Sequence, residues 1–434
     1  MQKLLKGITS LAATTGLMLA LTACGGNGGA ATTPAPAPNA PGGGAAAQPP
    51  AVTAPAVPTG ISQGVTDTSI LIGNSIATSG ALAPVGVPFQ AGLEAYLLMV
   101  NSQGGIAGRT INYIHQDDEF NPVNGIAILE GLIQDDQVFA IVGHFGTPVI
   151  GATVDMLVDS GIPAVYFAAG TGVVYNRAQN LFPVQPVFPM EGRIMAAIAA
   201  GEFGAERIGV IFTNDDAGTD ILSGLNTQNN IMGNSLEIIT AQVAPGADDV
   251  SAAVTTIMAA DVDFIVIASI QGTMPQIARQ LAAQGNTVPA ITSYVNVDAV
   301  MSGLVADDIA GTFDLFGTGW VDVTHTDMDL FGYWVRQAAS DDFSDSSFAM
   351  TGWIAGHFFV EGLRRVGDGE LNWDTFMAAM EEAPIRTPFG EYIDFANGQR
   401  DGTQVMNLSR MDGTVDGGWV QTMPFRTMEE LLAQ

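Results

Sequence analysis

The sequence predicts an α/β fold built as two similar lobes, each a parallel sheet flanked by helices. From residue 69 onward, short apolar segments alternate with amphipathic segments of helical period. This alternation occurs in two successive runs of about 120 residues, with a loop rich in Gly and Pro between them. The predicted fold class is therefore α/β, with two similar, Rossmann-like lobes.

The first run contains four expected strands and three expected helices. Apolar stretches of strand length occupy residues 69–76, 111–115, 138–142 and 164–167. Helical spacing covers residues 89–101 and 148–160. A third helix starts at Asn121, because the proline that follows it suits a first helical position.

The second run shows the same alternation of strands and helices. It gives strands at 207–212, 264–268 and 288–292, with helices at 219–228, 250–260 and 273–284. After Gly311 the pattern becomes mostly helical, at 328–339, 348–365 and 372–380. A terminal hairpin is expected around Asn397-Gly398, beginning near Tyr392.

The N-terminus predicts export and lipid attachment. Lys3 and Lys6 precede an apolar run of about 14 residues, shorter than the roughly 20 that span a bilayer, so residues 1–23 are interpreted as a cleaved signal peptide. Leu-Thr-Ala-Cys at 21–24 resembles the bacterial lipoprotein box, which implies lipidation of Cys24. As the only cysteine, Cys24 leaves no disulfide and no cysteine metal site.

Residues 24–63 are predicted to be a tether. Within 25–60 there are 8 Gly, 8 Pro and 11 Ala and no charged residue, a composition that cannot bury enough surface to fold. Membrane contact is therefore expected through the lipid anchor only.

Charge excludes several functions. Past residue 24 the chain has 12 arginines, no lysine and all 44 acidic residues, a formal charge of −32. Binding to nucleic acid is not expected, since affinity for phosphate backbones comes from clustered Lys and Arg. Lysine chemistry, such as Schiff bases and phosphate-loop lysines, is excluded as well.

Motifs of catalysis and metal binding are missing or out of context. The single G-x-S-x-G, at residues 60–64, has no strand before it, so it is interpreted as chance. His115, His144, His325 and His357 lack ligand spacing. We therefore expect no metal, no cofactor and no enzymatic activity.

Three acidic stretches are interpreted as turns. The 117–119 cluster is expected to be a solvated turn, with catalytic acid/base work as the alternative. Residues 214–216 are expected to lead into the next helix, with a cleft-lining role as the alternative. Residues 394–401 lack the full calcium-loop pattern.

Two loops stand where parallel sheets bind ligands, beyond the carboxyl ends of strands. Residues 143–148 follow one strand and enter a helix whose first-turn N–H groups, with the Thr147 hydroxyl, can hold an anion or carbonyl. Residues 168–172 follow the next strand and are small enough for the backbone to approach a ligand. Both loops contain Gly and Thr, so a shared ligand site is expected.

Ordered motifs resemble the leucine/isoleucine/valine-type solute-binding proteins of ABC importers, over roughly residues 65–417. The most specific string is Asn-Ser-Gln-Gly-Gly-Ile-Ala-Gly-Arg at 101–109. The others, in order, lie at 70–73, 78–80, 117–118, 121–122, 143–147, 161–163, 207–210, 262–264 and 276–285.

The resemblance implies a type I periplasmic binding protein, a clamp of two Rossmann-like lobes joined by a hinge, which close over a ligand. In amino-acid-binding members the ligand carboxylate is held by loops that match Phe145, Gly146 and Thr147, and Ala169, Gly170 and Thr171.

Three second-lobe positions depart from the family pattern, two of them where the ammonium group is usually met and one where an aromatic residue usually lines the cleft. An acidic residue usually stands before the helix at 273–284, but here Gln271 and Thr273 are found. Ala217 replaces the tyrosine of a D-x-Y-G pattern. These departures argue against a free α-amino acid gripped by a second-lobe carboxylate.

Residues 64–186 with about 316–392 are predicted to form lobe 1, and 187–315 with about 393–424 lobe 2. The expected function is an extracytoplasmic, lipid-anchored receptor, in the periplasm or on the outer cell surface. As a monomer it captures a small polar or carboxylate-bearing solute for ABC permease subunits. The alternative is a ligand-sensing or regulatory receptor on the same fold.

Overall fold

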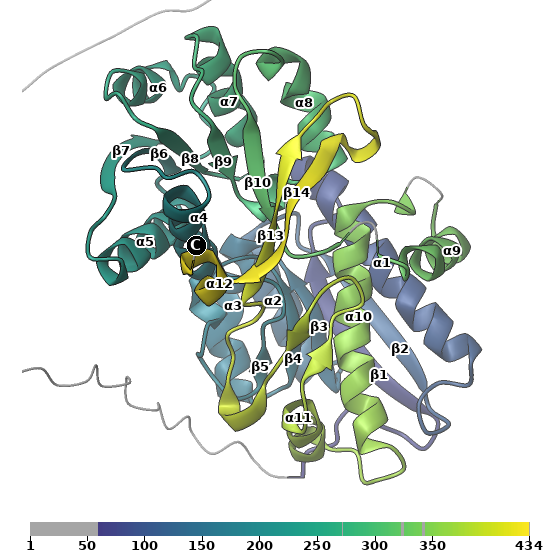
Figure 1. The fold of residues 1–434 in the computed structure, drawn as a ribbon. Coiled ribbons are helices and arrows are strands. Elements are labelled where there is room, and N and C mark those ends of the chain that lie inside the picture. Colours follow the sequence, from purple (N-terminus) through teal and green to yellow (C-terminus); the bar gives the residue numbers. More distant parts are fainter. Residues whose placement is uncertain (1–59, 271, 323–324, 341–342, 434) are drawn as a thin grey trace, which may run out of the picture. The chain divides into compact units, whose positions relative to one another are not determined.

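The computed structural model describes residues 60–270, 272–322, 325–340 and 343–433, and its strands form two large sheets (Figure 1). The first sheet is wholly parallel, in the order β2-β1-β3-β4-β5. Its strands are β1 (Ser69–Ile76), β2 (Thr110–Asp117), β3 (Ala140–Phe145), β4 (Ala164–Ala168) and β5 (Leu181–Phe182). All six residues of β3 are buried, as expected for a strand covered by helices on both faces.

The second sheet has the order β14-β13-β10-β9-β8-β6-β7. Its parallel strands are β6 (Arg207–Thr213), β7 (Glu237–Val243), β8 (Phe264–Ala268), β9 (Ala290–Thr292) and β10 (Leu315–Gly319). The antiparallel strands β13 (Val405–Met411) and β14 (Trp419–Thr427) extend it. We call the first sheet with its helices lobe 1 and the second sheet with its helices lobe 2.

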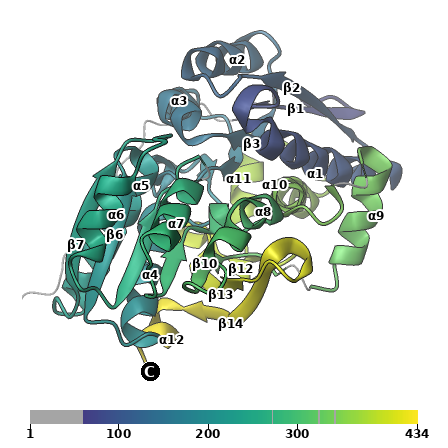
Figure 2. The same cartoon turned by 90° about the horizontal axis from the view of Figure 1, so that it is seen from above.

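Lobe 1 carries the helices α1 (Ala83–Ser102), α2 (Pro122–Gln134), α3 (Thr147–Ser160), α9 (Met328–Ala338), α10 (Ser347–Val366) and α11 (Trp373–Glu381). Helix α1 lies along α10 (Figure 2). The two backbones touch at glycines, because a Cβ on Gly92 would stand 1.8 Å from the Ala349 carbonyl oxygen. Although α1 is long and apolar enough to cross a membrane, 61% of its apolar window is buried, which is typical of a core helix.

Lobe 2 carries the helices α4 (Phe188–Gly201), α5 (Asp216–Ile231), α6 (Ser251–Met258), α7 (Met274–Ala283), α8 (Ala299–Ile309) and α12 (Met428–Leu432). Helices α4 and α5 pack closely, since a Cβ on Gly192 would stand 2.1 Å from the Ile221 carbonyl oxygen. The sequence pattern did not predict α4 or α8.

The C-terminal part differs from the prediction in two places. The segment at Asn397-Gly398 is a 3-10 turn, Ala396–Gly398, so the predicted hairpin there is wrong. Before it, β11 (Ile385–Arg386) pairs with β12 (Tyr392–Ile393). The larger hairpin is β13–β14, where Gly417 and Gly418 supply the positive φ angles of the turn.

Strand β10 was also missed. Its sequence, Leu-Phe-Gly-Thr-Gly, carries two glycines and little β-propensity, yet it pairs with β9 on one side and β13 on the other. It ends at Gly319, which lies beyond the crossover predicted near residue 316. Burial between neighbouring strands overrides a weak local preference here.

Candidate functional site

The two predicted loops lie side by side at the carboxyl edge of the first sheet. Strands β3 and β4 are parallel neighbours with Phe145 opposite Ala168, so the loops that follow them are adjacent. The Gly146 N–H donates to the Ala168 carbonyl oxygen at 3.2 Å and ties the loops together. This placement agrees with the rule that parallel strands end at one edge.

The first loop presents backbone rather than large side chains. The Phe145 ring packs in the core, 5.9 Å from the Phe89 ring, so only its main chain faces outward. Gly146 has φ 92° and precedes α3, whose second residue is Pro148. Thr147 is half-buried, and its N–H and that of Val149 lie in the first turn, where helices leave N–H groups without helical partners.

The ring of Phe120, which follows β2, packs against this loop. A Cβ on Gly146 would stand 2.8 Å from a ring carbon of Phe120, so the ring lies directly on the glycine. Phe120 itself has φ 60° and follows Glu119 at φ 56°, both in the left-handed region. Two strained residues in succession need support from their surroundings.

Asp118 provides that support, which corrects the prediction of a solvated turn at 117–119. The Asp118 side chain is fully buried and accepts hydrogen bonds from the Ser75 hydroxyl and, at 2.8 Å, from the Phe120 N–H. Burial raises the pKa of this carboxyl. Asp117 is exposed and accepts from the Thr78 N–H at 3.0 Å, so the cluster fastens two loops together.

The second loop is more deeply enclosed. A Cβ on Gly170 would stand 2.5 Å from the Phe188 ring, and the Gly170 carbonyl accepts from the Phe188 N–H at 2.6 Å. Ala169 is 8% exposed, and Thr171 is fully buried with its hydroxyl oxygen 3.4 Å from the Val173 N–H. The Gly170 carbonyl is therefore hydrogen-bonded to α4, and the Thr171 side chain is removed from solvent.

The second-lobe candidates occupy two separate places. Ala217 is buried in the first turn of α5, just after Asp215, which caps that helix by accepting from the Gly218 N–H at 3.0 Å. Thr273 is buried before α7, and its hydroxyl oxygen accepts from the Gly246 N–H at 2.8 Å. Gln271 lies outside the described residues, as do Cys24, the signal peptide and most of the predicted tether.

Two acidic residues of α5 stand at the junction of the lobes. Asp216 belongs to the 214–216 stretch, for which a cleft-lining role was the alternative prediction, whereas sequence reasoning did not single out Asp220. Asp220 Oδ2 accepts a hydrogen bond of 2.8 Å from the Gly172 N–H, and burial raises the pKa of this carboxyl. Asp216 Oδ2 lies 3.9 Å from the Cβ position of Gly151 in α3. A spacing of four residues at the start of a helix puts both carboxylates on one face, which was the available signal.

A polar chain lies where the main chain passes from lobe 1 to lobe 2. The Tyr166 hydroxyl donates to Gln185 at 2.8 Å, and the Gln185 amide donates to the Tyr294 hydroxyl at 2.9 Å. The Tyr294 hydroxyl in turn donates to the Pro186 carbonyl oxygen at 2.9 Å. These bonds hold the crossover segment against both lobes.

Glu191, in the first turn of α4, is fully buried beside this chain. Its carboxylate accepts from the Tyr294 N–H at 2.8 Å, the Ser293 hydroxyl at 2.7 Å and the Thr318 hydroxyl. Burial outweighs these three donors and raises the pKa of Glu191 to about 7.

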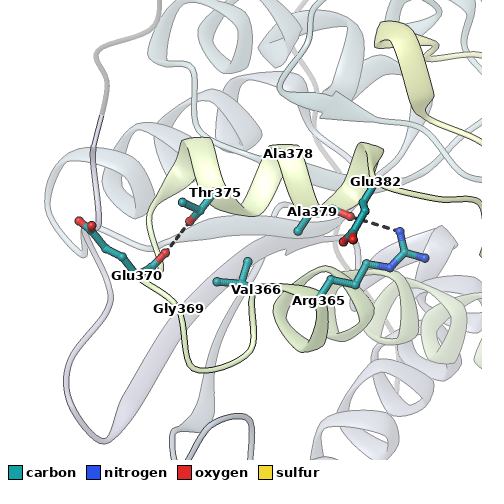
Figure 3. A pocket seen from close by; sticks show the side chains of 8 residues that line it. All are labelled: Arg365, Val366, Gly369, Glu370, Thr375, Ala378, Ala379 and Glu382. Carbon is teal, nitrogen blue, oxygen red and sulfur yellow. Dashed lines mark hydrogen bonds between the residues drawn. The ribbon is translucent and has the colours of Figure 1, made fainter.

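Two surface hollows lie away from the strand-end loops. One, of about 390 Å³, lies between the end of α10 and α11 (Figure 3). Its Arg365 donates to the carbonyl oxygens of Ala379 and Ala383, and the guanidinium is therefore hydrogen-bonded within the fold. The other lies between α2 and α3, at Met156 and its neighbours. Neither includes a predicted site residue.

The described residues contain no group of three or more His, Cys, Asp or Glu placed to hold a metal ion. His144 is fully buried and shares a hydrogen bond of 2.8 Å with the Thr153 hydroxyl, and burial lowers its pKa to about 4. The groups that the two strand-end loops present to a solute are hydrogen-bond donors and acceptors.

The family model for periplasmic binding proteins matches residues 69–418. The chain belongs to the periplasmic binding protein family. Curated relatives of this periplasmic binding protein include an amino acid binding protein of Pseudomonas aeruginosa, 24% identical over 56% of this chain. That alignment spans 63% of the relative's length, less than two thirds.

Two further comparisons extend over more of the chain. Leu/Ile/Val-binding protein homolog 1 of Brucella abortus is 22% identical over 74% of this chain and 85% of its own length. A fatty acid ABC transporter substrate-binding protein from Thermomonospora curvata superposes with a TM-score of 0.73 at 18% identity, covering 87% of this chain and 98% of that one. The fold is thus that of the two-lobed type I periplasmic binding proteins, as the sequence predicted.

The family places this periplasmic binding protein outside the cytoplasm, among solute-binding proteins. It is a family of non-enzymatic binding proteins. Membership of the family does not determine the solute, because one fold carries many ligand chemistries.

Proposed function

We propose that the protein is a lipid-anchored, monomeric receptor of an ABC importer that captures a small polar or carboxylate-bearing solute between its lobes. The observation that carries the proposal is the adjacency of loops 145–147 and 169–171, joined by the Gly146 to Ala168 hydrogen bond. The export signal and the lipoprotein-box resemblance at Cys24 support the anchor.

The first loop is the proposed anion acceptor. The N–H groups of Thr147 and Val149 lie in the first turn of α3, and the half-buried Thr147 hydroxyl stands beside them. Neither loop contains a basic residue. A bound carboxylate would therefore be stabilised by the positive end of the helix and by hydrogen bonds rather than by an ion pair.

The second lobe contacts the part of the ligand that lies away from its carboxylate. Ala217 supplies a small apolar surface, and the Thr273 hydroxyl oxygen already receives the Gly246 N–H. We propose that no carboxylate at the start of α7 grips a ligand ammonium group. The names of the relatives mention both amino acids and a fatty acid, which agrees with a carboxylate as the shared feature.

A matched thermal-shift series tests this function. The probes are L-leucine, 4-methylpentanoate and 4-methylpentanamide, which remove first the ammonium group and then the carboxylate, together with benzoate and octanoate. A ligand at about 100 times its Kd stabilises the folded state by about 2.7 kcal/mol. We expect stabilisation by at least one carboxylate and none by the matched amide. Equal stabilisation by acid and amide would contradict the anion site.

A further inference from the structure

A hydrogen bond from a side chain joins helix α5 of lobe 2 to a strand-end loop of lobe 1. Gly172 follows the loop at 169–171, and its N–H donates to Asp220 Oδ2 at 2.8 Å. Asp220 belongs to α5, which packs on the second sheet through contacts with β6 and β8. The bond therefore links the two lobes directly, beside the crossover segment rather than within it.

The two elements approach closely at this point. A Cβ on Gly172 would stand 3.1 Å from Asp220 Oδ2 and equally near the Pro189 side chain of α4. Glycine leaves room for the carboxylate to reach the main chain. Helix α5 begins with its own cap, Asp215, so the Asp220 carboxylate in the second turn is not needed to satisfy that helix.

The surroundings of the Asp220 carboxylate make its hydrogen bond to the Gly172 N–H important for the closed arrangement of the lobes. Asp220 is half-buried, and Asp216, one turn earlier on the same helix, adds a like charge. Removing a carboxylate from water is costly unless a donor compensates it, and here the compensating donor stands on the opposite lobe. When the lobes separate, the carboxylate returns to water and the bond is lost.

We propose that Asp220 is a positioning residue that holds lobe 2 closed against the 169–172 loop through the Gly172 N–H. Because this N–H is occupied, the anionic group of a ligand is directed to Thr147 and the first turn of α3. The first statement rests only on the two-lobed fold. The second rests on the function proposed above.

The closed-state contact is measured without any ligand. Cys24→Ser is made in the full chain, and spin labels are attached to cysteines introduced at Ala127 of α2 and Ala252 of α6, both exposed. Pulsed electron paramagnetic resonance then gives the distance distribution between the lobes. Asp220→Ala is expected to lower the ratio of closed to open molecules about tenfold, as for loss of a hydrogen bond to a charged group.

Two variants separate the bond from the charge. Asp220→Asn keeps an acceptor oxygen of the same shape and is expected to lower the ratio less than Asp220→Ala. Asp307→Ala removes an equal charge from an exposed position of α8, also in lobe 2, and is expected to leave the ratio unchanged. If Asp220→Ala does not fold by circular dichroism, Asp220→Ser and Asp220→Asn carry the test.

The proposal is overturned if the Asp220 variants have the distance distribution of the parent, or if Asp307→Ala shifts it as much as Asp220→Ala. Because no ligand is present, such a failure says nothing against solute binding. A thermal-shift series without any hit, by contrast, leaves the distance result standing.

Discussion

The two strand-end loops of lobe 1 have similar compositions but different surroundings. After β3, Thr147 is half-buried and its first-turn N–H group lacks a helical partner. After β4, Thr171 is fully buried, Gly170 is bonded to Phe188, and Gly172 is bonded to Asp220 of lobe 2. From this difference we propose a division of work, in which the first loop receives the solute and the second joins the lobes.

The largest expected effect concerns Glu191, at the crossover behind the second loop. Its pKa is about 7 in the folded protein against 4.5 for the ordinary group, so the folded state binds the extra proton between these values. The stabilisation that comes from this raised pKa is fully present below about pH 4.5. It is lost as the pH rises through 7, which lowers the free energy of unfolding by about 3 kcal/mol. Glu191→Gln keeps an acceptor for the Tyr294 N–H and is expected to remove this loss.

Urea unfolding of parent and variant at pH 5 and pH 8 measures the effect. The variant is expected to gain on the parent at pH 8 and to match it more closely at pH 5. Glu130→Gln, an exposed carboxyl on α2, serves as the control and should not alter the difference between the two pH values. An equal pH dependence in parent and Glu191→Gln would contradict the assignment.

Gly170→Ala is the next largest change and tests how tightly the second loop is enclosed. The added methyl would stand 2.5 Å from the Phe188 ring, which belongs to the buried core. Overpacking of this kind costs about 2 kcal/mol, measured as a lower free energy of unfolding. Gly131→Ala on α2, where a Cβ meets nothing within 4 Å, is the matched control and should be neutral or slightly stabilising.

Thr147→Val separates binding from stability at the first loop. The substitution removes one hydroxyl from a half-buried position, so affinity for the best carboxylate of the thermal-shift series should fall about tenfold. The free energy of unfolding without ligand should change by less than about 0.5 kcal/mol. Thr227→Val, exposed in the second half of α5, is the control. Unchanged affinity, measured by calorimetry, would remove Thr147 from the site.

Thr171→Val should have the smallest effect and the opposite character. The hydroxyl oxygen lies 3.4 Å from the Val173 N–H, a weak bond whose loss costs up to about 1 kcal/mol of stability. The comparison of the two loops predicts a larger loss of stability for Thr171→Val than for Thr147→Val, and a smaller loss of affinity. The reverse order would show that the second loop is the principal ligand contact.

Much of the fold follows from local pattern. The strands at 69–76 and 264–268 and the helices at 328–339 and 348–365 were predicted nearly at their observed bounds, because apolar period reports directly on which face is buried. The hairpin was placed at the wrong turn, since Asn397-Gly398 and Gly417-Gly418 both carry turn chemistry and local sequence alone did not distinguish them.

The sequence by itself determined two runs of strands and helices, two small loops at adjacent strand ends and an acidic domain without lysine. These features depend on period, turn residues and charge, all of which are local properties. Only the tertiary structure decided that Asp220 meets Gly172, that Phe120 lies on Gly146, and that Glu191 is buried among donors from β10 and the segment after β9. Such contacts join residues far apart in the chain, so they follow from sheet register and lobe packing rather than from any pattern within one segment.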